Sequence, residues 1–314
     1  MKKQLKKLGK PRLLIVGCGD VGMRLLPLVR DRFRVFALTS QAARCAELRA
    51  AGAVPLLADL DQPASLRKLA GLADWIVHLA PPRSEGVLDS RTQNLTAILP
   101  DKSRLVYVST TGVYGDCGGA EFDETRRVQP SNARAVRRVA AEQHLRAWAR
   151  RSASALSILR VPGIYAYERL PVERLQKGTP ALMAADDVYT NHIHADDLAQ
   201  LIRLALFRAR PQRVYHAVDD SALKMGDYFD LVADTFHLPR PARLPRAELA
   251  QQVSPVLLSF MSESRRLHNR RIKDELGARL RYPTVQEGMA AARRQHLEQI
   301  RHLPCGFRFS WQTK

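Results

Sequence analysis

The sequence predicts an α/β fold: a doubly wound parallel sheet covered by helices on both faces, with a smaller C-terminal lobe. Short, nearly continuous apolar runs alternate with helix-like segments through the first half of the 314 residues. A glycine-rich turn joins the first apolar run to the first helix, and the alternation breaks down after residue 160. Strands buried on both faces are typical of parallel sheets between helices, and such sheets bind ligands at the carboxyl ends of their strands.

The first predicted strand runs directly into the sequence Gly-Cys-Gly-Asp-Val-Gly. In this spacing Gly17 permits a tight turn, Gly19 lets the backbone approach a pyrophosphate, and Gly22 lets the helix pack on the strand. The helix N-terminus around Asp20 and Val21 offers amide donors and a positive dipole end to phosphates. A glycine turn between a strand and a helix therefore predicts a dinucleotide-binding site.

The second predicted strand indicates which dinucleotide binds. A domain that selects NAD usually ends this strand with Asp or Glu, which bonds the adenosine ribose. Here Thr39 and Ser40 follow the strand, so no carboxylate would repel a 2′-phosphate. Arg44, about a turn further on, could pair with that phosphate. We therefore predict NADP(H) in preference to NAD(H); the alternative is that Arg44 is only a solvated helix residue.

The remaining elements follow without an internal repeat or a low-complexity linker. The predicted strands are residues 13–16, 34–38, 54–58, 75–79, 104–109 and 156–160, and the predicted helices are 65–72, 91–99 and 134–151. A helix at 195–208 and a strand at 213–217 should return to the main sheet. We expect residues 1–160, with 195–220, to form the NAD(P)-binding domain. Residues 161–194 and 221–314 should form the substrate-binding lobe.

Composition narrows the class of partner. Lys and Arg number 50 against 31 acidic residues, a formal net charge of +19, but the positive residues are spread along the chain and aromatic residues make up only 6%. No nucleic-acid-reading motif accompanies them, so the charge indicates a bias toward anionic small molecules rather than specific nucleic-acid binding.

Other sequence features point to a cytoplasmic protein. No apolar run is long enough to span a membrane, and no signal-peptide core follows the basic N-terminus. The cysteines are scattered without Cys-x-x-Cys spacing, which predicts reduced thiols rather than disulfides or a zinc site: Cys18, Cys45, Cys117 and Cys305. We predict no bound metal.

Further motifs stand at the ends of the predicted strands. They are Asp59-Leu60, His78-Leu79-Ala80-Pro81-Pro82, the Val-Tyr-Val-Ser-Thr-Thr-Gly-Val-Tyr-Gly run of 106–115, Leu-Arg-Val-Pro-Gly-Ile-Tyr at 159–165, and Asn-His-Ile-His-Ala-Asp-Asp-Leu-Ala at 191–199. Their order resembles the extended short-chain dehydrogenase/reductases, the NAD-dependent epimerase/dehydratase family. The resemblance implies a Rossmann fold with a C-terminal substrate lobe. It places Asp59 and Leu60 beside the adenine, and Leu79, Ala80 and Pro81 along the cofactor. The sequence leaves open whether the protein forms a homodimer.

One departure from the family concerns its catalytic pair, a Tyr and a Lys four residues later on the helix after Val-Tyr-Gly. Alignment on the Ala-Ala-Glu that ends at Glu142 puts Arg134 at the Tyr position and Arg138 at the Lys position. Arginine cannot donate a proton near neutral pH. Arg138 could still hold the nicotinamide ribose or an anionic substrate, so the chain resembles an atypical member that lacks the Tyr-x-x-x-Lys pair.

Other side chains are candidates for the missing chemistry. Thr110 matches the Ser/Thr position of the family, although it could equally satisfy local backbone groups. Tyr114 and His192 are candidate proton-transfer residues, since histidine titrates close to neutral pH. We expect His194, two residues further on, to cap the next helix near Asp196.

The candidate substrate-binding residues are Arg134, Arg160 and Tyr165. Arginine is suited to carboxylate or phosphate capture. These observations favour an NAD(P)-dependent oxidoreductase or epimerase acting on an unidentified small substrate that is anionic or sugar-like. The alternative is a non-catalytic NADP(H)-sensing or scaffolding protein, which would keep the dinucleotide turn and lose the proton-transfer pair.

Overall fold

The computed structural model describes residues 9–301; Cys305 and the lysines before residue 9 lie outside this range. Its centre is a seven-stranded sheet in the order β12-β7-β5-β4-β1-β2-β3, in which all neighbours are parallel. The strands are β1 (Arg12–Val16), β2 (Arg34–Thr39), β3 (Val54–Leu57), β4 (Trp75–His78), β5 (Arg104–Thr110), β7 (Ala155–Val161) and β12 (Arg213–His216). This doubly wound α/β architecture confirms the predicted fold class.

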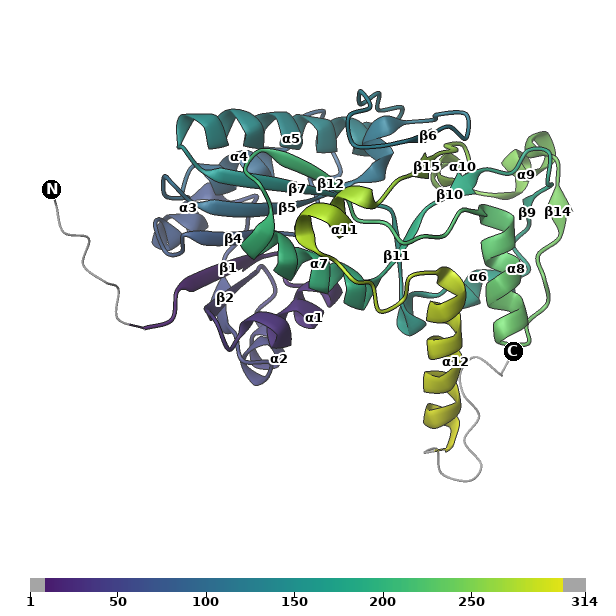
Figure 1. Cartoon of the computed structure of the whole chain (residues 1–314), viewed down its shortest axis with the longest axis horizontal. Coiled ribbons are helices and arrows are strands. Elements are labelled where there is room, and N and C mark those ends of the chain that lie inside the picture. Colours follow the sequence, from purple (N-terminus) through teal and green to yellow (C-terminus); the bar gives the residue numbers. More distant parts are fainter. Residues whose placement is uncertain (1–8, 302–314) are drawn as a thin grey trace, which may run out of the picture.

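Helices cover both faces of the sheet (Figure 1). One layer holds α1 (Asp20–Val29), α2 (Cys45–Ala50), α7 (Ala195–Arg208) and α11 (Arg270–Leu276). The other holds α3 (Pro63–Leu66), α4 (Ser90–Thr96) and α5 (Ala133–Arg151). The helices α3 and α4 are shorter than predicted, and a 3-10 turn continues α3 through Leu69. The bounds of α5 differ from the prediction by a single residue at its start.

The apolar strands form one core on each side of the sheet. On β1, Leu13 and Ile15 belong to the core beneath α1 and α7, whereas Leu14 and Val16 belong to the core beneath α5. Successive side chains of a strand point to opposite faces, so a strand that is buried on both faces must be apolar throughout. The unbroken apolar runs in the sequence have this cause.

The rest of the chain forms short strand pairs and helices beyond the carboxyl ends of the main strands (Figure 1). The strands are β6 (Glu121–Phe122) with β15 (Arg266–Leu267), β8 (Gly163–Tyr165) with β11 (His192–His194), β9 (Ala181–Leu182) with β14 (Arg243–Leu244), and β10 (Tyr189–Thr190) with β13 (Leu223–Lys224). The helices are α6 (Val172–Gln176), α8 (Met225–Thr235), α9 (Arg246–Gln252), α10 (Pro255–Phe260) and α12 (Val285–Arg301). A third apolar cluster joins α6, α8 and α12.

A helix cap links this part of the chain to the main sheet. His194 ends β11, and its Nδ1 accepts a hydrogen bond of 3.2 Å from the backbone N–H of Asp196 at the start of α7. The predicted capping role of His194 is confirmed. The chain then returns through α7 to β12, which pairs with β7 at the edge of the sheet.

A buried histidine on β12 completes a polar network below the sheet edge. His216 Nδ1 lies 3.0 Å from the carbonyl oxygen of His268, and its Nε2 lies 2.6 Å from the hydroxyl of Tyr114. That hydroxyl also accepts a 2.7 Å hydrogen bond from Arg160. The neutral imidazole can donate to the carbonyl and accept from the tyrosine, and burial lowers the pKa of His216 to about 3.

This histidine should make folding sensitive to mild acid. In the unfolded chain a histidine takes up a proton near pH 6.5, whereas folded His216 stays neutral down to a pKa of about 3. Lowering the pH from about 7 to about 5 should therefore remove about 2 kcal/mol of stability through this group. Urea unfolding at both pH values measures the free energy of unfolding. Between the two pH values this free energy should fall by about 2 kcal/mol more for the wild type than for His216→Gln. Equal losses would contradict the assignment.

Candidate active site

The glycine turn forms the floor of a cleft of about 310 Å³ at the carboxyl end of β1. Gly17 has a φ of +85°, and a Cβ there would lie 2.6 Å from the backbone nitrogen of Ala80. A Cβ on Gly22 would lie 2.9 Å from Cys18 Sγ, so the close packing of α1 requires that glycine as well. Around Gly19, by contrast, a Cβ would meet no described atom within 4 Å.

These features fit a dinucleotide. The open space above Gly19 lies at the start of α1, where no side chain among residues 9–301 caps the helix. Uncapped amides with free space in front of them suit a pyrophosphate. The cleft brings together several of the predicted cofactor residues: Gly17, Gly19, Asp20, Val21, Gly22, Leu79 and Arg138.

The predicted adenosine-end residues lie beside the glycine turn without lining this cleft. Arg44 Nη1 donates a 2.6 Å hydrogen bond to the carbonyl oxygen of Cys18, and its Nε donates to Glu47 at 3.1 Å. Thr39 Oγ1 accepts from the N–H of Gln41 at 3.1 Å, and Ser40 is exposed. Arg44 is therefore tied to the glycine turn itself, rather than being only a solvated helix residue.

The other predicted cofactor residues have separate surroundings. The carboxylate of Asp59 accepts from the N–H of Asp61 at 2.9 Å, and Leu60 is buried in the core. Ala80 packs in the same core and directly faces Gly17. Pro81 lines a second, larger cavity instead of the cleft.

The larger cavity, of about 880 Å³, lies between the main sheet and the C-terminal elements. It adjoins the glycine-turn cleft, and five residues line both spaces: Thr110, Arg138, Pro162, Ile164 and Arg169. The predicted site residues Thr110, Arg134, Arg138, Tyr165 and His192 all line the larger cavity.

Two predicted site residues lie elsewhere. Tyr114 and Arg160 line neither space; both belong to the buried network that includes His216. Arg160 forms an ion pair of 2.7 Å with Glu142 of α5. The structure thus gives these two side chains a role in packing β7 against α5, and no contact with a ligand in either space.

The arginines at the family's Tyr and Lys positions point in different directions. Arg138 Nη1 donates to the hydroxyl of Tyr107 at 2.9 Å and to the carbonyl oxygen of Val108 at 3.0 Å. These bonds hold it at the junction of cleft and cavity. The Arg134 guanidinium instead lies 4.1 Å from the ring centroid of Phe260 on α10. The Arg134 guanidinium also donates to Ser259 Oγ at 3.4 Å, so its polar contact is with α10 as well.

The remaining candidates differ in how well their polar atoms are satisfied. Thr110 Oγ1 accepts from the N–H of Gly112 at 3.2 Å, which is the local backbone role considered above. The Tyr165 hydroxyl donates to the carbonyl oxygen of Thr284 at 3.3 Å, and burial raises its pKa. His192 is 5% exposed, and its Nδ1 has no partner among residues 9–301. Burial lowers the pKa of His192 to about 4.

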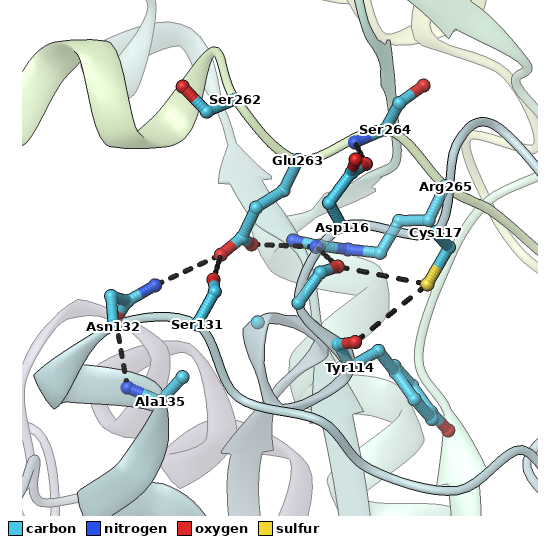
Figure 2. Close-up of polar contacts among 12 residues, drawn as sticks. Tyr114, Asp116, Cys117, Ser131, Asn132, Ala135, Ser262, Glu263, Ser264 and Arg265 are labelled. Atoms are coloured by element: carbon cyan, nitrogen blue, oxygen red, sulfur yellow. Dashed lines mark hydrogen bonds and ion pairs between the residues drawn. The ribbon is translucent and has the colours of Figure 1, made fainter.

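The sequence alone did not reveal Glu263, which lines the larger cavity. Figure 2 shows its polar contacts. Its carboxylate accepts from Ser131 Oγ at 2.6 Å and Asn132 Nδ2 at 3.0 Å, and pairs with Arg265 at 2.7 Å. Asn132 in turn caps α5 by accepting from the N–H of Ala135. Glu263 lies 132 and 131 residues from Ser131 and Asn132, which directly precede α5, so no local spacing could have indicated the contact.

Comparison with known protein families identifies the family of this chain. A family described as "RmlD substrate binding domain" matches residues 12–281. The chain belongs to this family. The predicted membership of the NAD-dependent epimerase/dehydratase group is confirmed, because the family and its structural neighbours are members of that group. Comparison with curated proteins gave no match.

Solved structures share the fold of this chain. A functionally unknown conserved protein from Silicibacter pomeroyi is 30% identical, with a TM-score of 0.75 over 91% of this chain and 99% of that one. UDP-glucose 4-epimerase from Thermotoga maritima, solved with UDP-glucose, is 15% identical, with a TM-score of 0.74 over 92% and 99%.

A third similar structure was solved with a nicotinamide dinucleotide. It is dTDP-glucose 4,6-dehydratase from Streptomyces venezuelae with NAD and TYD bound, 22% identical, with a TM-score of 0.73 over 91% of this chain and 97% of that one.

Within residues 9–301 the helices are too short or too polar to cross a membrane.

The two glycines of the turn should respond differently to substitution. Gly19→Ala introduces a Cβ into open space at a φ of −82°, so the protein should keep its melting temperature. The same methyl should reduce NADPH affinity by about tenfold or more, because it fills the space needed by a pyrophosphate. Calorimetric titration and thermal melting measure the two effects.

Gly17→Ala is the matched comparison. Its Cβ would clash with the Ala80 backbone at a φ of +85°, so it should lose about 2 kcal/mol or more of stability. If Gly19→Ala bound NADPH as tightly as the wild type, the cleft would not be the pyrophosphate site.

Proposed function

We propose that this protein is an NADP(H)-dependent oxidoreductase or epimerase of a small anionic substrate of the sugar-nucleotide class. In this proposal residues 1–160 and 195–220 hold the cofactor, and residues 161–194 and 221–314 hold the substrate. The observation that carries it is that the two spaces lie side by side. A cleft suited to a dinucleotide adjoins, at Thr110 and Arg138, a cavity large enough for a second ligand.

The cofactor would be held from both ends of the cleft. The α1 N-terminus and Gly19 face the pyrophosphate, and Arg138 reaches the junction where the nicotinamide ribose would lie. The nicotinamide supplies or accepts the hydride when it is bound.

Free thiols at Cys18, Cys45 and Cys117 support a reducing, cytoplasmic location.

The substrate class is supported by the family and by the cavity. Two structural neighbours were solved with UDP-glucose or with NAD and TYD. Seven arginines line the larger cavity, and Glu263 is the single acidic residue among the described residues that line it. Such walls favour a negatively charged ligand.

His192 is the proposed proton-transfer residue. It lines the larger cavity, it is buried, and its Nδ1 is unpartnered within the described part of the chain. Burial lowers its pKa to about 4, so the imidazole is neutral at neutral pH but a weak base. A bound anionic substrate would raise that pKa and strengthen the imidazole as an acceptor of a proton from a substrate hydroxyl. The Thr110 hydroxyl, on the shared wall, would orient the same substrate oxygen.

A second function is favoured by the position of Arg134. The residue at the family's Tyr position stacks on Phe260 and cannot transfer a proton. A protein that binds NADP(H) and senses it without turnover would tolerate this change. Turnover is the property that separates the two functions.

Cofactor preference should depend on Arg44. Its guanidinium is tied to the glycine turn and lies near the end of β2, where no carboxylate opposes a 2′-phosphate. A charge-assisted hydrogen bond is worth about 1.5–3 kcal/mol, so Arg44→Ala should weaken NADPH by roughly tenfold or more and leave NADH affinity nearly unchanged. Fluorescence titration of both cofactors measures this.

The exposed Arg49 on α2 provides the control for that titration. Arg49→Ala should change neither affinity. If Arg44→Ala weakens NADH as much as NADPH, the side chain supports the turn and not the phosphate. Tighter binding of NADH by the wild type would overturn the NADP preference.

Turnover of sugar nucleotides tests the enzymatic proposal directly. UDP-glucose, UDP-glucuronate and dTDP-glucose can be incubated with the protein and NADP⁺ or NAD⁺, with absorbance at the NADPH wavelength and product chromatography as readouts. His192→Asn should lower kcat by about a hundredfold or more with unchanged NADPH affinity. The wild-type rate should stay flat across neutral pH and fall only as the pH approaches the lowered pKa of His192.

The matched control is His237→Asn, because His237 is exposed, follows the C-terminal end of α8 and lines neither space. It should retain full activity. NADPH binding without turnover of any sugar nucleotide would favour the sensing function. Turnover that survives His192→Asn would remove His192 from the proton-transfer role.

A further inference from the structure

The charges around the larger cavity are unbalanced. Seven arginines line it: Arg83, Arg134, Arg137, Arg138, Arg169, Arg174 and Arg265. Three of them pair with carboxylates, at N–O distances from 2.7 to 3.6 Å: Arg265 with Glu263, Arg169 with Asp20 and Arg83 with Asp61. The other four have no ion pair within residues 9–301, although they line the same cavity.

Arg137 is the most informative of these four. It is 6% exposed, and one of its terminal nitrogens donates to the carbonyl oxygen of Gly86 at 3.0 Å. Its Nε is buried and has no partner in the described part of the chain. A buried guanidinium without a counter-charge destabilises the protein that holds it. Arg137 is therefore a charge that the free protein leaves uncompensated.

Three of the unpaired arginines lie together on α5. Arg134, Arg137 and Arg138 are spaced i, i+3 and i+4, so they are neighbours on the helix surface. We call them the α5 arginine wall. All three line the cavity, and Arg138 also lines the glycine-turn cleft, which places one member of the wall where the two spaces adjoin.

We infer that the α5 arginine wall binds a carboxylate or phosphate group on the reacting end of the substrate. The inference rests on the proposed function, because the cleft defines which end of the substrate reacts. The wall replaces a proton-transferring pair with groups that bind anions and transfer no proton. A neutral sugar at this junction would leave the charge of Arg137 uncompensated, whereas a sugar acid or a sugar phosphate would neutralise it.

Arg174 is the fourth of these arginines and lines a different part of the cavity. It lies on α6, its guanidinium is 4.3 Å from the ring centroid of Phe229, and its Nε is also buried without a partner among residues 9–301. Burial lowers its pKa to about 10. Because Arg174 lies on α6 and the other three unpaired arginines lie on α5, two different helices contribute positive charge to the cavity.

Small anions test the wall without knowledge of the whole substrate. NADPH-saturated protein can be titrated with malonate, inorganic phosphate and neutral glucose at constant ionic strength, with calorimetry and melting temperature as readouts. Malonate or phosphate should bind saturably and glucose should not; the tighter anion identifies the group. Arg137→Met should weaken the anion by about tenfold or more. Arg150→Gln, an exposed change at the other end of α5, should leave anion binding unchanged.

The melting temperature of the free protein separates anion binding from a structural role. Arg137→Met removes an uncompensated charge, so it should keep or raise the melting temperature while losing the anion effect. A lower melting temperature with intact anion binding would mean that Arg137 only holds the Gly86 loop, and would overturn the inference. If Arg137→Met does not fold, Arg134→Gln on the exposed end of the wall must weaken anion binding, or the inference fails.

The same titrations separate this inference from the proposed function. Failure of the wild type to bind NADPH would refute the cofactor assignment. The anions can then be titrated into the free protein, where the α5 arginine wall should still bind them. Saturable NADPH binding with no anion binding in the wild type would refute the wall and leave the cofactor assignment intact.

Discussion

The buried ion pair between Arg160 and Glu142 determines where α5 lies, and the candidate site depends on α5. Both side chains are almost fully buried, with 6% and 5% of their surface exposed, and they meet at 2.7 Å. Ser109 of β5 donates to the same carboxylate at 2.6 Å, so two central strands are joined to one helix. Removing one partner of such a pair typically costs about 3–5 kcal/mol, because the other charge is left buried alone.

A second carboxylate holds the other end of the helix. Glu263 binds Ser131 and Asn132 directly before the first turn of α5 (Figure 2). A negative charge near a helix N-terminus is favourable, and here it comes from the segment between α10 and β15. The α5 helix is therefore anchored to the sheet by one carboxylate and to the C-terminal elements by another. Between these two anchors the helix carries Arg134, Arg137 and Arg138, which line the larger cavity.

The chemistry of that face differs from the family pattern in a definite way. A tyrosine and a lysine at these positions would move a proton; Arg134 and Arg138 can only bind and stabilise negative charge. In the proposed function the proton transfer falls to His192 on another wall of the cavity. The proposed site thus combines a dinucleotide cleft with the α5 arginine wall.

The sequence by itself determined the fold class, the glycine turn and the family. Unbroken apolar runs and the spacing of Gly17, Gly19 and Gly22 are local patterns, and their physical causes act over a few residues. The capping role of His194 was predictable for the same reason, since it depends on a neighbour two residues away.

Only the tertiary structure decided which polar residues share a cavity. Tyr114 and Arg160 were reasonable site candidates from the sequence, yet a network from β7, β12 and α5 buries them away from it. Arg137 and Glu263 were not candidates, because burial and unpaired charge arise from segments far apart in the chain. Electrostatic compensation depends on distance in space, and local sequence patterns carry no record of it.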